Sequence, residues 1–558
     1  MNQNSHGSDD DIASDASQDD VREAVVQDTW KTMFQSTEHL LFGTRQTPYN
    51  LSTLHPDQFQ IFRLWQIYLD HIDPLLKVTH TPSMQGRIID SAQDLTRTTP
   101  ETEALMFSIY CVSVHSLHED DCLATFGAAR RDLLVRFQFG CQQALSNCDF
   151  LRSNDLECLT AIYLYLLSAR QETDPRSLSA LLGIAVRIAQ RMGLHIESKN
   201  VACTAFKAEL RRRVWWALVL FDARISEMAD HKTSILSPTW DCKTPANMND
   251  FAIGPEIKQH PMTHGFPTES IFTVVRSELA DFTRHCAFHL DFTTPALKLI
   301  VREASTSPDL ADDDLNALEE RIQEKYLKFC NPENALQFMT IWTARSILSK
   351  NRLLQHYSRY SRTGSQQTDE QRDMAVSYTL TMLESDTTIA KNPLVKGYLW
   401  LVNSYFPFPA YIHLVQDLRR RPRAKHVEQC WQSMNENYSS RFATLDEQNN
   451  PFFRILGKQV LQAWVAYEDA CKDSGSVPDR LQIIKDIERR GIKLPATPKD
   501  PGSTSAGTSV GTRADGANIS ATMGFGSDGV LFPDLPQQAF MDVDMDLFDW
   551  TAVDWGKL

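Results

Sequence analysis

His115, His118 and Cys122 carry side chains of the kinds that bind metal ions. Their spacing of three and four residues would place them on one face of a continuous helix. The alternative, which we favour, is the end of a helix with incidental polar residues, because such positions are far commoner than metal sites. We therefore predict no metal site and no cofactor.

Carboxylate pairs suggest a second kind of chemistry, the binding of magnesium and diphosphate in all-helical enzymes. Asp120 and Asp121 lack a third acid at the required spacing, and Asn249 and Asp250 are followed by Ile253 where a hydroxyl ligand is needed. The sequence also contains no glycine-rich phosphate loop, no G-x-S-x-G elbow and no H-E-x-x-H pair. We predict that the protein is not an enzyme.

The composition indicates an intracellular protein. Its 558 residues are 42% apolar and 23% charged, and the net charge of −15 argues against a protein that coats nucleic acid. The eleven cysteines are odd in number and irregularly spaced, unlike a secreted disulfide framework. The first residues lack a signal-peptide pattern, and the longest apolar runs, such as Leu159 to Leu167, are too short to cross a membrane.

The stretch from Leu178 to Asp250 is predicted to form two amphipathic helices and a covering loop. From Leu178 to Met192 the apolar residues recur at steps of three and four, which is typical of a helix with one buried face. Gly193 is placed to end this helix in a left-handed conformation, with Leu194 folding back on Ala189.

The second helix is expected from Glu209 to Met228, with three arginines in its first turns. Glu209 is placed to pair with Arg212 or Arg213. Arg212 also lies one turn before Trp216, which suggests a cation–π contact. We expect these arginines to form structural ion pairs rather than a ligand site.

The order of these segments resembles the middle homology region of fungal-specific transcription factors. The chain has a helix ending in RMGLH, then ELRRRVWW, an FDARIS helix and a PANMND loop. It has Ala229, Asp230 and His231 where the family usually carries Gly-Arg-Pro. His80, Thr81 and Pro82 resemble the family's short his-x-pro loop. The family-motif residues with a structural role are Gly193, Arg211, Arg212, Arg213, Trp215, Trp216, Asp222 and Ser226.

The sequence predicts an all-α fold, a multi-helix array of the kind found in this family's regulatory domain. Pro56 is expected to begin a first helix. Further helices are expected over Glu103 to Leu117, Leu156 to Ser168, Ile271 to Phe288, Asp314 to Phe329, Glu333 to Tyr357, Gln371 to Ile389 and Tyr398 to Leu418. We predict an acidic disordered segment over 1–49, the helical domain over 50–494, a linker over 495–530 and an activation segment over 531–558.

The last segment alternates aspartates with aromatic and aliphatic residues, a composition typical of disordered transcriptional activation segments. Such segments fold onto coactivator grooves and use their rings as anchors. The predicted anchors are Phe540, Leu547, Phe548, Trp550 and Trp555.

A short basic run, Arg419, Arg420, Arg421, Arg423 and Lys425, could be recognised by importins. The alternative, which we favour, is a helix C-terminus stabilised by cations.

Members of this family usually carry a DNA-binding zinc cluster of six closely spaced cysteines, and no Cys-x-x-Cys pair occurs here. The resemblance implies a nuclear, pathway-specific transcription regulator of a catabolic route or a secondary-metabolite gene cluster. The implied partners are the transcription machinery and coactivators, with DNA reached through a partner protein or a zinc-cluster domain absent from this sequence. A non-DNA-binding cofactor and a small-molecule-sensing helical receptor are the alternatives. A second copy of the chain and a small-molecule effector are further candidate partners, and no membrane is expected.

Overall fold

The computed structural model describes residues 50–170, 173–229, 239–255, 265–286, 310–360, 367–442, 452–453, 456–473, 475 and 477–492. All regular secondary structure in these ranges is helical, and they contain no β-strand. The predicted all-α fold class is therefore confirmed. In the same ranges no helix is long and apolar enough to cross a membrane.

The chain divides into two compact units. Residues up to Asn351 together with Thr388–Phe406 form the first unit, and Arg352–Thr387 with the residues from Pro407 onward form the second. The helices of the first unit are α3 (Gln58–Ile67), η1 (Tyr68–Ile72), α4 (Asp73–Leu76), α5 (Thr81–Gln93), η2 (Leu95–Arg97), α6 (Pro100–His115), α7 (Glu119–Phe126), α8 (Arg130–Asn147), α9 (Leu156–Ala169), α10 (Pro175–Arg191), α11 (Glu197–Val201), α12 (Ala205–Ala229), η3 (Asp250–Ala252), α13 (Ile271–His285), α16 (Leu310–Lys325), η5 (Leu327–Phe329), η6 (Pro393–Tyr398) and α19 (Leu399–Val402).

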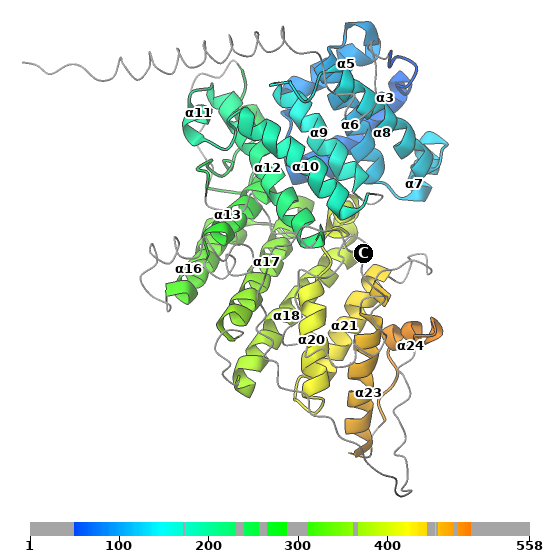
Figure 1. Ribbon diagram of the computed structural model, residues 1–558, viewed down its shortest axis with the longest axis vertical. Helices are drawn as coiled ribbons and strands as arrows, with labels where there is room; N and C mark the ends of the chain where they lie inside the picture. Colours follow the sequence, from blue (N-terminus) through cyan, green and yellow to red (C-terminus); the bar gives the residue numbers. More distant parts are fainter. Residues whose placement is uncertain are drawn as a thin grey trace, which may run out of the picture. The chain divides into compact units, whose positions relative to one another are not determined.

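Helix α6 is the centre of the first unit and packs against α8 and α9 (Figure 1). It is apolar around most of its circumference, which is typical of a helix buried on all sides. Thr99 caps its first turn, with Pro100 at the first helical position. Gly140 on α8 is needed because a Cβ there would overlap the Phe107 ring of α6.

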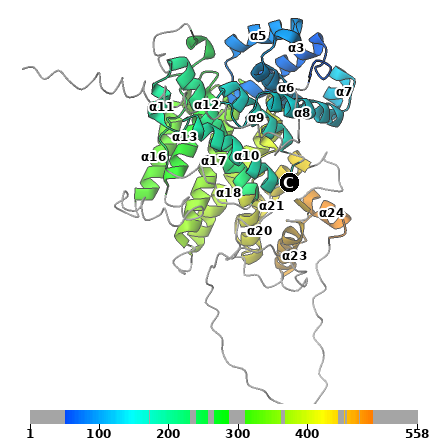
Figure 2. The ribbon, with the colours of Figure 1, turned by 45° about the horizontal axis from the view of Figure 1, so that its top comes forward.

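Helices α10 and α12 pack against each other and lie side by side in both ribbon views (Figures 1 and 2). Asp174 caps α10, and Gly193 ends it with φ of +73°. The Leu194 amide donates to the Ala189 carbonyl over 3.0 Å, which is the predicted Schellman-type stop. Helix α12 begins at Ala205, four residues before the predicted start.

Two predicted helix positions near prolines are wrong. Pro56 does not begin α3, because Asp57 is the N-cap and its carboxylate accepts from the Gln60 amide. The helix predicted over Tyr398 to Leu418 is two helices, α19 and α20 (Phe408–Arg420), because the proline at 407 cannot donate a hydrogen bond to α19. Thr81 and Pro82, predicted in a loop, are the first residues of α5.

The second unit is an array of antiparallel helices around an aromatic core. The chain enters it within α17 (Ala335–Tyr360) and leaves it within α18 (Asp369–Lys391), then returns to form α20, α21 (Val427–Phe442), α23 (Gly457–Asp473) and α24 (Gln482–Arg489). Trp431 and Trp464 meet edge to face with ring centroids 5.0 Å apart. The Tyr411 hydroxyl donates to the Asn437 side chain, and both residues are buried.

The predicted segments 1–49, 495–530 and 531–558 fall outside the described residues. Their boundaries remain predictions.

Candidate functional site

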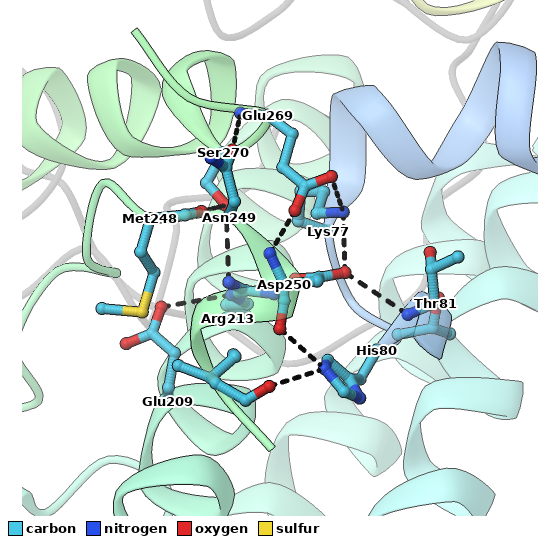
Figure 3. A network of polar contacts seen from close by, with 12 residues as sticks. Lys77, His80, Thr81, Glu209, Arg213, Met248, Asn249, Asp250, Glu269 and Ser270 are labelled. Carbon is cyan, nitrogen blue, oxygen red and sulfur yellow. Dashed lines mark hydrogen bonds and ion pairs between the residues drawn. The ribbon is translucent and has the colours of Figure 1, made fainter. Parts of the chain in front are cut away.

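The first candidate site is a buried ion-pair network centred on Asp250, shown in Figure 3. Its members are Asp73 and Lys77 at α4, Glu209 and Arg213 on α12, Asp250 at η3, and Glu269 before α13. Arg213 is fully buried and Lys77 is 1% exposed. The network therefore joins segments that are far apart in the sequence.

Asp250 binds a different cation with each carboxylate oxygen. Its Oδ1 accepts from Arg213 Nη1 over 2.7 Å, and its Oδ2 accepts from Lys77 Nζ over 2.9 Å (Figure 3). Burial alone would raise the pKa of Asp250, but the charges of Arg213 and Lys77 outweigh burial and lower that pKa. The carboxylate is therefore ionised at neutral pH.

The two cations have further partners. Lys77 Nζ donates to Asp73 Oδ2 over 2.9 Å and lies 3.5 Å from a Glu269 oxygen. Arg213 Nε donates to Glu209 Oε1 over 3.1 Å, as predicted from their spacing. Burial alone would lower the pKa of Lys77, and the neighbouring carboxylates of Asp73 and Asp250 raise it instead. Both cations therefore stay charged.

The his-x-pro segment is tied to the same loop. The buried His80 ring places Nε2 3.0 Å from the Asp250 carbonyl oxygen and 3.1 Å from the Ile253 carbonyl oxygen. Since carbonyl oxygens only accept, Nε2 is the protonated nitrogen and donates. The Thr81 amide donates to Asp250 Oδ2 over 3.3 Å. The two family-like segments therefore hold each other in place.

The other two arginines of the predicted motif have separate partners. Arg211 Nε donates to the Asn200 side chain over 2.8 Å, and Arg212 Nε donates to Glu197 Oε1 over 3.2 Å. The predicted cation–π contact between Arg212 and Trp216 is wrong, because Arg212 turns toward Glu197 instead. Trp216 meets the Trp240 ring at a centroid distance of 5.2 Å.

The remaining motif residues lie in the interior of the first unit. Trp215 and Trp216 are fully buried, and Asp222 and Ser226 are buried on the following turns of α12. Trp216 Nε1 donates to the Lys243 carbonyl over 2.8 Å, which fastens the extended segment after residue 239 to α12. In the network and in these contacts the side chains bind other groups of the protein.

The second candidate site is a small cavity of about 20 Å³, partly open to solvent, in the first unit. Residues of α4, α9, α12, α13 and α19 contribute to its walls, which are mostly apolar. Its polar lining residues are Tyr163, Arg170, Thr273, Arg276 and Tyr405. These residues come from five separate segments, so no local sequence pattern predicts the cavity.

The three residues weighed as metal ligands do not share one helix. His115 is the last residue of α6, whereas His118 is the N-cap of α7, so the continuous helical face does not exist. His115 is buried, and burial followed by the charge of Arg130 lowers its pKa to about 3. Among the described residues no group of three or more His, Cys, Asp or Glu could hold a metal ion.

The basic run lies at the end of α20, in the second unit. Arg419 and Arg420 are in the last turn of the helix, and Arg421 donates to Asp417 and Asp373. Arg423 pairs with Asp473, and Lys425 Nζ lies 3.3 Å from Asp373. Arg421, Arg423 and Lys425 therefore contact carboxylates. The predicted anchors Phe540, Leu547, Phe548, Trp550 and Trp555 lie outside the described residues.

Comparison with known proteins relates this geometry to a family. The model of the fungal specific transcription factor domain matches residues 65–259, a range that includes Lys77, Arg213 and Asp250. The transcriptional regulator AacuB of Aspergillus aculeatus is 51% identical over 86% of this chain and 65% of its own length.

This chain covers a larger share of the length of two further relatives. The transcriptional regulator nsrM of Aspergillus novofumigatus is 42% identical over 97% of this chain and 78% of its own length. The aurofusarin cluster transcription factor aurR2 of Gibberella zeae is 32% identical over 85% of this chain and 70% of its own length. With this extent of similarity, the chain belongs to the family of fungal-specific transcription factors.

Proposed function

We propose that this protein is a pathway-specific transcription regulator that activates a secondary-metabolite gene cluster. The observation that carries this proposal is the 32% identity to the aurofusarin cluster transcription factor over 85% of the chain. A relative named for the pyriculol/pyriculariol biosynthesis cluster, from Pyricularia oryzae, is 25% identical over 77% of the chain. A catabolic route is the less favoured target, since these relatives are named for biosynthetic clusters.

The helical domain and the acidic segment are proposed to have separate roles. In the first unit the ion-pair network joins distant segments, and its residues contact other protein groups. The acidic segment 531–558 recruits coactivators through its rings, while the aspartates keep the rings solvated and speed encounter with basic surfaces. The helical domain is then the regulatory part and the segment is the activating part.

Contact with DNA is proposed to come from a partner or from a zinc-cluster domain that is not in this sequence. Two relatives are named as C6 finger domain transcription factors, and this chain covers 52% of the length of each. The rival function is a cofactor that never touches DNA. Mapping the 5′ end of the transcript separates the two, because an upstream exon with six closely spaced cysteines would establish the first.

We also propose that the protein works in the nucleus. Arg419 and Arg420 are exposed in the last turn of α20, and they are the cations that we propose for importin binding. The alternative role of this run is to stabilise the C-terminus of α20. A fluorescent fusion of the Arg419→Gln, Arg420→Gln variant tests the import role. A second copy of the chain and a small-molecule effector complete the proposed partners.

The activation segment is tested by tethering the chain to an unrelated DNA-binding domain upstream of a reporter gene. The fusion should activate the reporter. Replacing Phe548, Trp550 and Trp555 together by alanine should abolish activation, because a disordered segment gains its affinity from a few buried rings. Changing Asp542 and Asp544 to asparagine should reduce activation only partly. A silent fusion, or a fully active triple variant, would contradict the proposal.

A further inference from the structure

Four of the eleven cysteines lie in the core of the first unit, where α6, α8 and α9 contact one another (Figure 1). Cys111 is on α6, Cys141 is on α8, Cys148 is the C-cap of α8, and Cys158 is in the first turn of α9. All four are free thiols and are buried. They form two pairs that each share a hydrogen bond, Cys111 with Cys141 and Cys148 with Cys158.

The backbone brings the second pair to the same end of the α8–α9 hairpin. Helix α8 stops after Cys148, where Asp149 has φ of +48° and the Phe150 amide donates to the carbonyl five residues earlier over 3.3 Å. Asp155 caps α9, and its carboxylate accepts from the Cys158 amide over 3.1 Å. The two thiols therefore lie on the two helix ends that one short connection joins.

The two pairs differ in how easily an oxidant reaches them. Cys111 and Cys141 are within helices and are fully buried. Cys148 is 9% exposed, at a helix end, and precedes the exposed Asp149. A residue with a Cβ is strained in the left-handed region, so opening the chain at this end of α8 needs less free energy than opening it within the helices. We therefore expect Cys148 to be the first of the four thiols to react.

We propose that Cys148 and Cys158 are an oxidation site, at which hydrogen peroxide joins the two sulfurs in a reversible disulfide. In the first step the Cys148 sulfur attacks one peroxide oxygen, the O–O bond breaks, and a sulfenic acid and a water molecule form. In the second step the Cys158 sulfur attacks the Cys148 sulfur, the S–O bond breaks, and a second water molecule leaves. The two thiol protons end in the two water molecules, and the two sulfurs supply the two electrons that reduce the peroxide.

The surroundings of Cys148 determine the rates of the two steps. Its hydrogen bond with Cys158, followed by burial, raises the pKa of Cys148, so this thiol is protonated in the folded chain. Since the thiolate is the nucleophile, the first step is slow and follows local opening. The second step is fast because the two sulfurs are already neighbours, which protects Cys148 from further oxidation to the sulfinic acid.

The test is peptide mapping of the purified full chain after it has been treated with hydrogen peroxide in its folded state. Free thiols are then blocked with N-ethylmaleimide in denaturant, and the chain is digested with trypsin without a reductant. Arg152 lies between the two cysteines, so trypsin places them in the separate peptides 137–152 and 153–170. We expect these peptides to be linked, and dithiothreitol to release both with free thiols. The measurement needs no reporter gene, so its result is independent of the proposed function.

Variants and fragmentation assign the bond within the linked peptides. Peptide 137–152 contains Cys141 as well as Cys148, and fragmentation of the linked species from the parent chain should place the bond at Cys148. Cys148→Ser should abolish the linked species. The matched control Cys141→Ala changes the other cysteine of the same peptide and should retain it. The fragmentation result from the parent decides the assignment if a variant does not fold.

Three results would overturn the inference. The first is the absence of linked peptides at a peroxide concentration that oxidises the partly exposed Cys203. The second is a bond between Cys111 and Cys141 in place of the proposed one. The third is Cys148 recovered as the sulfinic acid while Cys158 keeps a free thiol, which would show that the second thiol does not react with the first.

Discussion

At the scale of single residues, Asp250 determines the electrostatics of the first unit. It lies between Arg213 and Lys77, two cations that are almost completely excluded from solvent. A buried pair adds little net stability compared with apolar residues, but removing one partner leaves the other charge uncompensated. We therefore expect the stability of the first unit to be sensitive to the loss of the Asp250 charge.

Asp250→Asn should destabilise the first unit by roughly 3 to 5 kcal/mol, because Lys77 and Arg213 both lose an ionic partner. Chemical denaturation followed by tryptophan fluorescence measures this. The matched control is Asp94→Asn, which removes a carboxylate from an exposed pair with Arg97 and should leave the denaturation midpoint unchanged. If Asp250→Asn unfolds at the same denaturant concentration as the parent, the network does not determine stability.

The sequence predicted only part of this network. Glu209 and Arg213 are four residues apart on a helix, so their pairing follows from helical geometry alone. Lys77 and Asp250 are separated by 173 residues, and no local rule connects them. Arg170 was missed for the same reason, since its neighbour Arg224 lies on α12 and Tyr405 follows α19.

At the scale of helices, the stop at Gly193 fixes where α10 ends and the chain turns toward α11. Gly193 has φ of +73°, and a Cβ there would lie 2.5 Å from Lys199 Cδ. Gly183 lies within α10, and a Cβ there would have no atom within 4 Å. One helix thus contains two glycines with opposite requirements.

Gly193→Ala should destabilise the protein by about 1 to 2 kcal/mol, because an L-residue is strained in the left-handed region. Gly183→Ala should instead stabilise it by up to about 1 kcal/mol, since alanine favours a helix interior. Thermal unfolding of the two variants beside the parent provides the comparison. Shifts of the same sign would mean that the left-handed stop is not what distinguishes these positions.

Long apolar helices were predicted well, and interruptions were predicted poorly. The ranges of α6, α9 and α13 agree with the predicted ranges to within three residues, because burial imposes a regular period on their sequences. The break between α19 and α20 was missed, because apolar residues continue on both sides of it. Periodicity records which face is buried, whereas a break depends on local backbone hydrogen bonds.

At the scale of the whole molecule, each unit buries a histidine in its neutral form. Burial, followed by the charge of Arg130, lowers the pKa of His115 in the first unit to about 3. Burial lowers the pKa of His413 in the second unit to about 4, although the carboxylate of Asp417 opposes this. Unfolding returns both imidazoles toward the ordinary value of 6.5.

Stability should therefore fall as the pH decreases below 6.5. Between that value and the folded pKa the unfolded chain binds more protons than the folded chain, and each histidine contributes a slope of up to about 1.4 kcal/mol per pH unit. The free energy of unfolding, measured by denaturation at several pH values in this range, should depend less steeply on pH in His115→Gln than in the parent. His285→Gln, at an exposed histidine, is the control and should keep the parent's slope. An unchanged slope in His115→Gln would contradict the prediction.

The long separation between Lys77 and Asp250 also has a consequence for synthesis on the ribosome. The N-terminal helices emerge first, with Asp73 beside the buried lysine, yet the second carboxylate that binds Lys77 is made 173 residues later. A nascent or truncated chain that ends before Asp250 contains Lys77 and Arg213 without the carboxylate that they share. We therefore expect such incomplete chains to be cleaved faster by proteases than chains that extend past the PANMND loop.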